Sequence, residues 1–248
     1  MMIDSNQPPA TRAYQVMALS LIVMLAGGCA AFRPTATPNP PKQYTLDSPL
    51  SSPSRPGRAT PRTAPVLLVN MPKAAPALDT RHMVYIRQLH KVEYFAHSEW
   101  VDTPAHMLAP LVAAALEQRG GFRAVVRAPS SVSADLRLDI ELLQLQQDFA
   151  HVPSLVRFAL RAEVIDDATR RLVASRQFET AASAPSEDPY GGVLATNAAV
   201  RTVLDDLAAF GTECACLWSV QHATTGGAQS ICAKQLPDSV VSPHRIDR

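Results

Sequence analysis

The chain has 248 residues, of which 47% are hydrophobic and 18% are charged, and its formal net charge is +1. This length suits one folded domain with flexible ends. A charge this close to zero, without an arginine-rich segment, argues against nucleic acid as a partner.

The first feature along the chain is a short apolar segment that ends at a cysteine. A basic start containing Arg12 precedes an apolar run from Val16 to Ala26. About ten such residues match the core of a secretory signal peptide and are too few for a membrane-spanning helix, which needs about 20. The small residues directly before Cys29 resemble a bacterial lipobox, although Ala26 stands where leucine is commonest.

This motif predicts that residues 1–28 are a lipoprotein signal peptide and that the mature protein begins with a lipidated Cys29. Two or three acyl chains, such as palmitate, would anchor it firmly, because one chain alone anchors only marginally. Ala30 follows the cysteine, and the absence of Asp there favours the outer membrane, with the protein facing the periplasm. The alternative is an ordinary signal peptide that is cut nearby, with Cys29 incidental.

The remaining chain is predicted to form a tether, one domain and a tail. Residues 29–42 are rich in proline, which favours a semi-extended tether. Residues 43–211 carry strand and helix patterns, interrupted by a Pro-, Ser- and Arg-rich loop at 48–65. Residues 212–248 lack periodicity and are predicted to be disordered.

Strand patterns recur through the predicted domain as apolar or alternating runs. The clearest is the run from Leu136 to Leu142, in which apolar and charged residues alternate. This alternation predicts a strand with one buried face and one solvent-exposed face. Hairpin turns are predicted at 88–91 and 166–170. The predicted strands are 43–47, 66–70, 83–87, 92–96, 122–127, 136–142, 156–164 and 172–182.

Two helices are predicted by apolar residues at helical spacing. The first follows Thr103 as N-cap, has Pro104 at its first position and stops at Gly120. The second opens at Pro189 and ends near Gly211. The predicted fold class is therefore α+β: a single domain with a largely antiparallel mixed sheet and two amphipathic helices on one face.

The sequence lacks the common catalytic signatures, such as G-x-S-x-G, H-E-x-x-H and the phosphate loop. Four histidines near the predicted hairpin have no spacing that converges on a metal, and three acidic residues fall on the wet face of a strand. These residues are His82, His90, His97 and His106, and Asp135, Asp139 and Glu141. We therefore predict a protein that is not an enzyme and that has no catalytic residue, metal or cofactor.

Three cysteines besides Cys29 lie near the end of the chain, namely Cys214, Cys216 and Cys232. An odd number in an oxidising compartment leaves one unpaired. Cys214 and Cys216 could supply two ligands of a metal site. A disulfide between Cys232 and one of these two cysteines is favoured over a metal site. Most simply, all three lie beyond the folded core. Their pairing stays open.

The order of several motifs resembles a known family. After the lipobox come Tyr44-Thr45-Leu46, Tyr85-Ile86-Arg87, the stretch Tyr94–Trp100, Thr103-Pro104 and Gly121-Phe122. This order is similar to that of the ABC-type transport auxiliary lipoprotein family, which includes the lipoprotein of the paraquat-inducible operon. The resemblance covers about residues 43–210. The loop at 48–65 and the tail after Gly211 depart from it.

The resemblance implies a non-enzymatic outer-membrane lipoprotein. Its partners would be an ABC permease, an ATPase and a mammalian-cell-entry (MCE) domain protein, which together move phospholipid or other apolar molecules between the membranes. Cys29 would be the anchor, and Tyr94, Phe95 and Trp100 would form an aromatic cluster in an interface or in the core. A structural role in envelope assembly is the alternative. Cargo, direction of transport, homo-oligomerisation and the partner-binding surface stay open.

Overall fold

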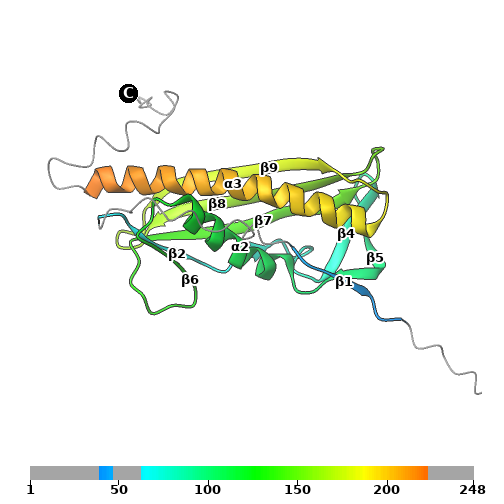
Figure 1. The fold of residues 1–248 in the computed structure, drawn as a ribbon, viewed down its shortest axis with the longest axis horizontal. Coiled ribbons are helices and arrows are strands. Elements are labelled where there is room, and N and C mark those ends of the chain that lie inside the picture. The colour runs from blue at the N-terminus through cyan, green and yellow to red at the C-terminus, as the bar shows by residue number, and fades with distance from the viewer. Residues whose placement is uncertain (1–38, 47–62, 223–248) are drawn as a thin grey trace, which may run out of the picture. The chain divides into compact units, whose positions relative to one another are not determined.

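The computed structural model describes residues 39–46 and 63–222, which contain nine strands and two helices (Figure 1). The predicted signal peptide, Cys29, most of the tether and the loop at 48–65 lie outside the described residues. The strands are β1 (Lys42–Tyr44), β2 (Val66–Val69), β3 (Lys73–Ala74), β4 (His82–Gln88), β5 (Lys91–Trp100), β6 (Ala124–Arg127), β7 (Leu136–Asp148), β8 (Leu155–Asp166) and β9 (Leu172–Ser183); the helices are α2 (Pro104–Arg119) and α3 (Pro189–His222).

The nine strands form one mixed sheet whose longest pairings are antiparallel. β8 pairs antiparallel with β7 and β9, and β4 and β5 form the predicted hairpin. On the other side of β7, strands β2, β3 and β4 run parallel to it. β6 adds to β2, and β1 adds to β5, both in parallel. The predicted α+β class with a largely antiparallel mixed sheet is confirmed.

The predicted alternation along β7 sorts its side chains between the core and the outer face. Leu136 and Leu142 are fully buried, and Leu138 is only 1% exposed. Asp139 and Glu141 lie on the opposite, wetter face because successive side chains of a strand point to opposite sides. Burial of this apolar face is the main favourable term in folding the sheet.

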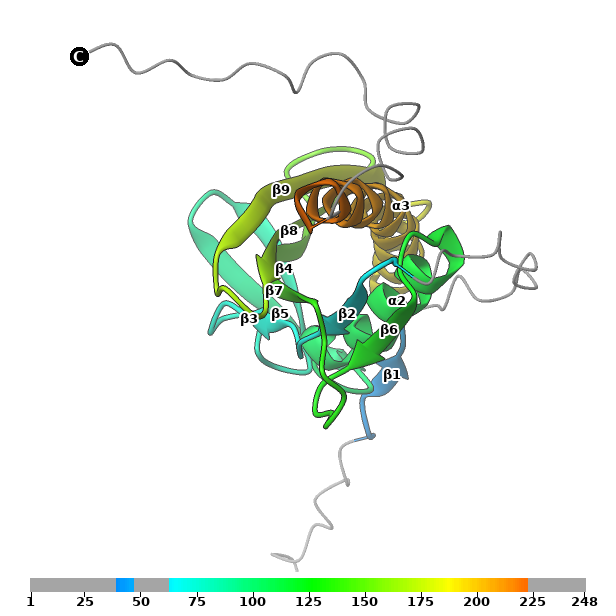
Figure 2. The ribbon, with the colours of Figure 1, turned by 90° about the vertical axis from the view of Figure 1, so that its left-hand side faces the viewer.

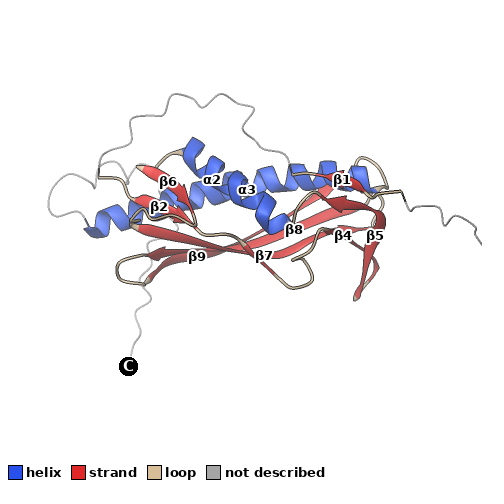
Figure 3. Ribbon diagram, turned by 90° about the horizontal axis from the view of Figure 1, so that it is seen from below, coloured by secondary structure: helices blue, strands red, loops and turns tan. Residues whose placement is uncertain are grey.

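Both helices pack on one face of the sheet, as predicted (Figure 3). Figure 2 looks nearly along α3 and shows α2 beside it. Thr103 is the N-cap of α2 and Pro104 begins the helix, as predicted, although the Thr103 side chain makes no capping hydrogen bond. At the other end, Gly120 and Gly121 have φ of 82° and 102°, a conformation that favours glycine.

The predicted end of the second helix at Gly211 is wrong, because α3 continues to His222. Gly211 lies where α3 crosses α2: a Cβ atom at this residue would be 2.6 Å from the Leu116 side chain. The glycine therefore permits close helix packing and does not stop the helix. Beyond it, Cys214 and Ala215 are buried, so residues 212–222 belong to the domain and not to a disordered tail. Residues 223–248 lie outside the described part of the chain.

A buried carboxylate fastens the last turns of α3 to the sheet. Asp166, at the end of β8, accepts a 2.7 Å hydrogen bond from the indole Nε1 of Trp218, and His222 Nε2 lies 3.5 Å from the same oxygen. The backbone N–H of Thr169 donates to the carboxylate, and so does the Thr169 hydroxyl. Hydrogen bonding, led by that backbone N–H, lowers the pKa of Asp166 below its ordinary value despite its burial.

Replacing Trp218 with phenylalanine is expected to destabilise the domain by about 1.5 to 3 kcal/mol at neutral pH, because a buried carboxylate loses a donor. A lowered carboxyl pKa contributes stability above the unfolded value of 3.8, and that stability is lost as pH falls through the folded pKa. Urea unfolding should therefore show the difference at about pH 5 and a smaller one below pH 3.8. Val220→Ala, an exposed change in the same turns, is the control. A difference independent of pH down to the acid limit would contradict this role of the indole.

Candidate docking surface

The three aromatic residues that the sequence singled out do not form one cluster. Trp100 is 3% exposed and belongs to the core. Tyr94 is 46% exposed, and its ring lies 5.5 Å from that of His82. Phe95 follows it on the strand and therefore points to the other face, where it is half-buried and packs against different partners.

Phe95 belongs to a group of three rings at the junction of the β4–β5 hairpin and β7. Its ring lies 4.5 Å from that of Tyr85 and 6.2 Å from that of Phe149. Tyr85 and Phe149 meet edge to face at 5.7 Å, a favoured arrangement of aromatic rings. The guanidinium of Arg87 lies 5.1 Å from the Tyr85 ring centre. Sequence reasoning missed Phe149 because a parallel pairing between distant strands brings it here.

The chain enters the domain at the same end of the sheet as this aromatic group. β4 runs beside the end of β7, with Ile86 opposite Asp148 and the backbone N–H of Phe149 donating to Ile86 O. The β4–β5 turn at 89–90 and the β7–β8 loop at 149–154 therefore leave the sheet together. β1 runs parallel to β5 and arrives from this direction (Figure 1).

The start of α3 completes this end. The Tyr190 ring lies 6.3 Å from that of Tyr44 in β1, and Gln147 Nε2 donates to the carbonyl of Asp188 at 3.4 Å. We name the "entry end" the surface formed by Lys42, the turn at 89–90, the loop at 149–154 and the first turn of α3.

The entry end exposes large apolar side chains. Val152 is 93% exposed and Leu89 is 80% exposed, the two highest values among the large hydrophobic side chains that the structure describes. Tyr190 is 54% exposed and Val92 is 50% exposed. Single exposed apolar residues are ordinary on a protein surface, but several at one end mark a surface suited to docking.

A buried aspartate shapes the loop that carries Val152. Asp148 accepts hydrogen bonds from the backbone N–H of Ala150 at 2.9 Å and from Arg157 Nε at 3.1 Å, and His151 Nδ1 lies 3.3 Å away. Burial alone would raise the pKa of Asp148. These hydrogen bonds and the nearby positive charges outweigh that effect and lower it. The loop is thus fixed by its own contacts.

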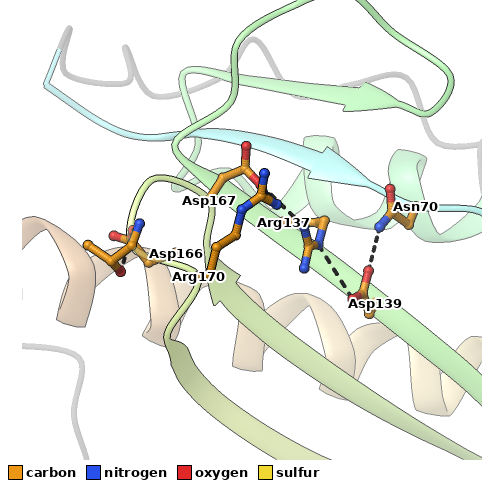
Figure 4. Close-up of polar contacts among 7 residues, drawn as sticks. Asn70, Arg137, Asp139, Asp166, Asp167 and Arg170 are labelled. Carbon is orange, nitrogen blue, oxygen red and sulfur yellow. Dashed lines mark hydrogen bonds and ion pairs between the residues drawn. The ribbon is translucent and has the colours of Figure 1, made fainter.

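The acidic residues of β7 are engaged in local contacts. Asp139 accepts a hydrogen bond from the Asn70 amide and lies 3.5 Å from Arg137 Nε (Figure 4). Arg137 also contacts Asp167, which accepts a 3.0 Å hydrogen bond from Arg170 in the β8–β9 turn.

The other acidic residues and the histidines of interest also lie apart from one another. Asp135 accepts a 2.8 Å hydrogen bond from the backbone N–H of Val66, and Glu141 forms an ion pair with Arg161 at 3.6 Å. His90 forms the hairpin turn with φ of 66°, and His106 lies 3.3 Å from Asp102. The His82 ring is tilted by 52° against that of Tyr94, and His97 is exposed on β5. Within residues 39–46 and 63–222, no three His, Cys, Asp or Glu side chains are arranged to hold a metal.

The two cysteines in the described residues differ. Cys214 is free and 1% exposed, and burial raises its pKa to about 12. The prediction that it lies beyond the folded core is therefore wrong. Cys216 is disulfide-bonded. Cys29 and Cys232 lie outside the described residues.

No helix in the described part of the chain is both long and apolar enough to cross a bilayer.

The solved structures that share this fold include two that cover most of this chain. One is protein XCC0632 from Xanthomonas campestris, with 24% identity and a TM-score of 0.59, covering 73% of this chain and 95% of that one. The other is an uncharacterized protein with 12% identity and a TM-score of 0.53, covering 68% of this chain and 97% of that one. At these identities the likeness establishes the fold alone.

No curated protein matches the sequence. The family model of the ABC-type transport auxiliary lipoprotein component matches residues 44–208, from β1 into α3. This match spans most of the chain and nearly all of the described domain. The chain therefore belongs to the ABC-type transport auxiliary lipoprotein family.

Proposed function

We propose that this protein is a non-catalytic docking component of an ABC transport system of the MCE type. A lipidated Cys29 holds it to the outer membrane, and the domain faces the periplasm. Its partners are the permease, the ATPase and an MCE-domain protein of the same system. The cargo is phospholipid or another apolar molecule that passes between the two membranes.

The family match over residues 44–208 is the observation that carries this proposal. The lipobox-like sequence before Cys29 supports the anchor, and Ala30 after it supports the outer membrane. The domain supports a docking role because Asp139 and Glu141, the acidic residues on the exposed face of β7, serve local ion pairs and hydrogen bonds. A docking part of this kind needs a tether and a rigid surface.

Single replacements of ionisable residues test the non-catalytic role. His90→Asn, His97→Gln, Asp139→Asn and Glu141→Gln are each expected to leave complementation of an envelope-stress phenotype nearly intact, because none is placed for general acid or base catalysis. His90→Asn suits the positive φ of this turn residue. Complementation should be measured together with the amount of membrane-bound protein.

One result would contradict the non-catalytic docking role. A variant of this set that folds normally, stays on the membrane and loses all activity would indicate a chemical function for that side chain.

A further inference from the structure

We propose that the entry end rests on the lipid surface of the membrane that holds Cys29, with Leu89 and Val152 dipping into it. This inference rests on the proposed lipid anchor and goes beyond it, because an anchor alone does not fix how the domain is oriented. The occupant of the exposed apolar end is therefore the bilayer, and the partner proteins bind elsewhere on the domain.

The first support is the position of the exposed apolar side chains. Leu89 lies at the tip of the β4–β5 turn and Val152 in the adjacent β7–β8 loop, and both turns leave the sheet at the entry end. Their exposures of 80% and 93% leave almost the whole side chain in water. Apolar residues on neighbouring turns can enter the headgroup region without unfolding any strand. Tyr190 lies at the same end, and tyrosine favours the membrane–water boundary.

The second support is the length of the tether. Residues 30–41 are the whole connection between Cys29 and β1, and fully extended they reach no more than about 43 Å. α3 begins beside β1 and has 34 residues, which makes it about 51 Å long. Its last turns contact Asp166 at the opposite end of the sheet. A tether shorter than α3 cannot let the domain stand on that opposite end with the entry end pointing away from the membrane.

The third support is the charge at the entry end. Arg87 and Lys91 flank the β4–β5 turn with 66% and 61% of their side chains exposed. Lys42 lies farther back, opposite Ser98 of β5 and near Asp188. The nearby Glu93 is only 23% exposed and lies between Arg87 and Lys91. Exposed basic side chains around apolar tips suit anionic lipid headgroups.

The acidic residues at the start of α3 are occupied within the protein. Asp188 accepts hydrogen bonds from the Ser186 hydroxyl and the Gly191 backbone N–H, and Glu187 accepts one from the backbone N–H of Ser154. Both residues are exposed, and accepting hydrogen bonds does not remove the charge of a carboxylate, so they offset part of the basic charge at this end.

Site-specific photo-crosslinking in native envelopes tests the proposal. A photoreactive amino acid is placed in the full-length protein at Leu89, Val152 or Leu172, and lipid adducts are quantified by mass spectrometry. Leu172 is the control, since it is 58% exposed but lies at the opposite end of β9. We expect several-fold more lipid adducts at positions 89 and 152 than at 172. Equal yields at all three positions, or adducts only to protein at 89 and 152, would overturn the proposal.

A double variant provides a second measurement. Leu89→Asp with Val152→Asp changes only exposed residues, so thermal stability should be nearly that of the parent, as it should be for Leu172→Asp. In the double variant, lipid adducts from a photoreactive residue at Tyr190 should fall several-fold, and in Leu172→Asp they should not. Unchanged adducts in both would contradict an apolar contact at the entry end.

Acyl labelling of the same samples separates the two proposals. Lipid adducts missing from a protein that carries the acyl label would overturn the orientation alone. Absence of the acyl label would overturn both the orientation and the anchor on which it rests.

Discussion

Replacing Leu138 with aspartate is expected to unfold the domain. Leu138 is 1% exposed near the start of β7, where it pairs with Val164 of β8 on one side and Val69 of β2 on the other. A carboxylate there would lose its hydration and find no compensating partner in an apolar core. The cost exceeds about 4 kcal/mol, which is a large part of the 5 to 15 kcal/mol that stabilises a typical domain.

Circular dichroism and limited proteolysis measure this effect. Leu172→Asp makes the same chemical change at a residue that is 58% exposed, and it should leave the melting curve nearly unchanged. A cooperative thermal transition for Leu138→Asp close to that of the parent would contradict the assignment of β7 to the centre of the core.

Replacing Cys29 with alanine is expected to abolish acylation and to impair complementation while the domain still folds. The thiol is the predicted attachment point of the acyl chains, and each buried methylene contributes about 0.8 kcal/mol to membrane binding. Two or three acyl chains therefore bind the protein to the membrane much more strongly than its exposed side chains could. Metabolic labelling with a clickable fatty acid, followed by membrane fractionation, measures both consequences.

The control for this variant is the folded state of the released domain. Its protease resistance should equal that of the parent, so that a loss of complementation reports the anchor and not the fold. Persistent acyl labelling of Cys29→Ala would refute the lipobox assignment.

Local sequence patterns predicted most of the secondary structure. The alternation from Leu136 to Leu142 predicted the buried face of β7, and the Thr103-Pro104 and Gly120-Gly121 pairs predicted both ends of α2. These signals succeed because each depends on local sequence alone. The alternation of side chains in a strand, the fixed φ of proline and the tolerance of glycine for positive φ need no contact with distant residues.

Features that depend on distant contacts could not be predicted in this way. A glycine after an apolar helical stripe is typical of a helix end, which is why the sequence predicts that α3 ends at Gly211. In the structure Gly211 lies within α3, where the helix packs closely against Leu116 of α2. The aromatic group at the hairpin likewise includes Phe149, which reaches it through the parallel pairing of β4 and β7. The entry end is formed by four separate segments, so no single motif in the sequence points to it.

Affinity purification from crosslinked envelopes tests the central proposal most directly. The lipid-anchored protein is captured, and the co-purifying proteins and lipids are identified by mass spectrometry, with Cys29→Ala as the unanchored control. The transport role predicts an ABC permease, its ATPase and an MCE-domain protein in the parent sample, with phospholipid or another apolar molecule, and a strong reduction of all of them with Cys29→Ala. Capture of envelope-assembly proteins without any of these three partners would contradict it and favour the structural alternative.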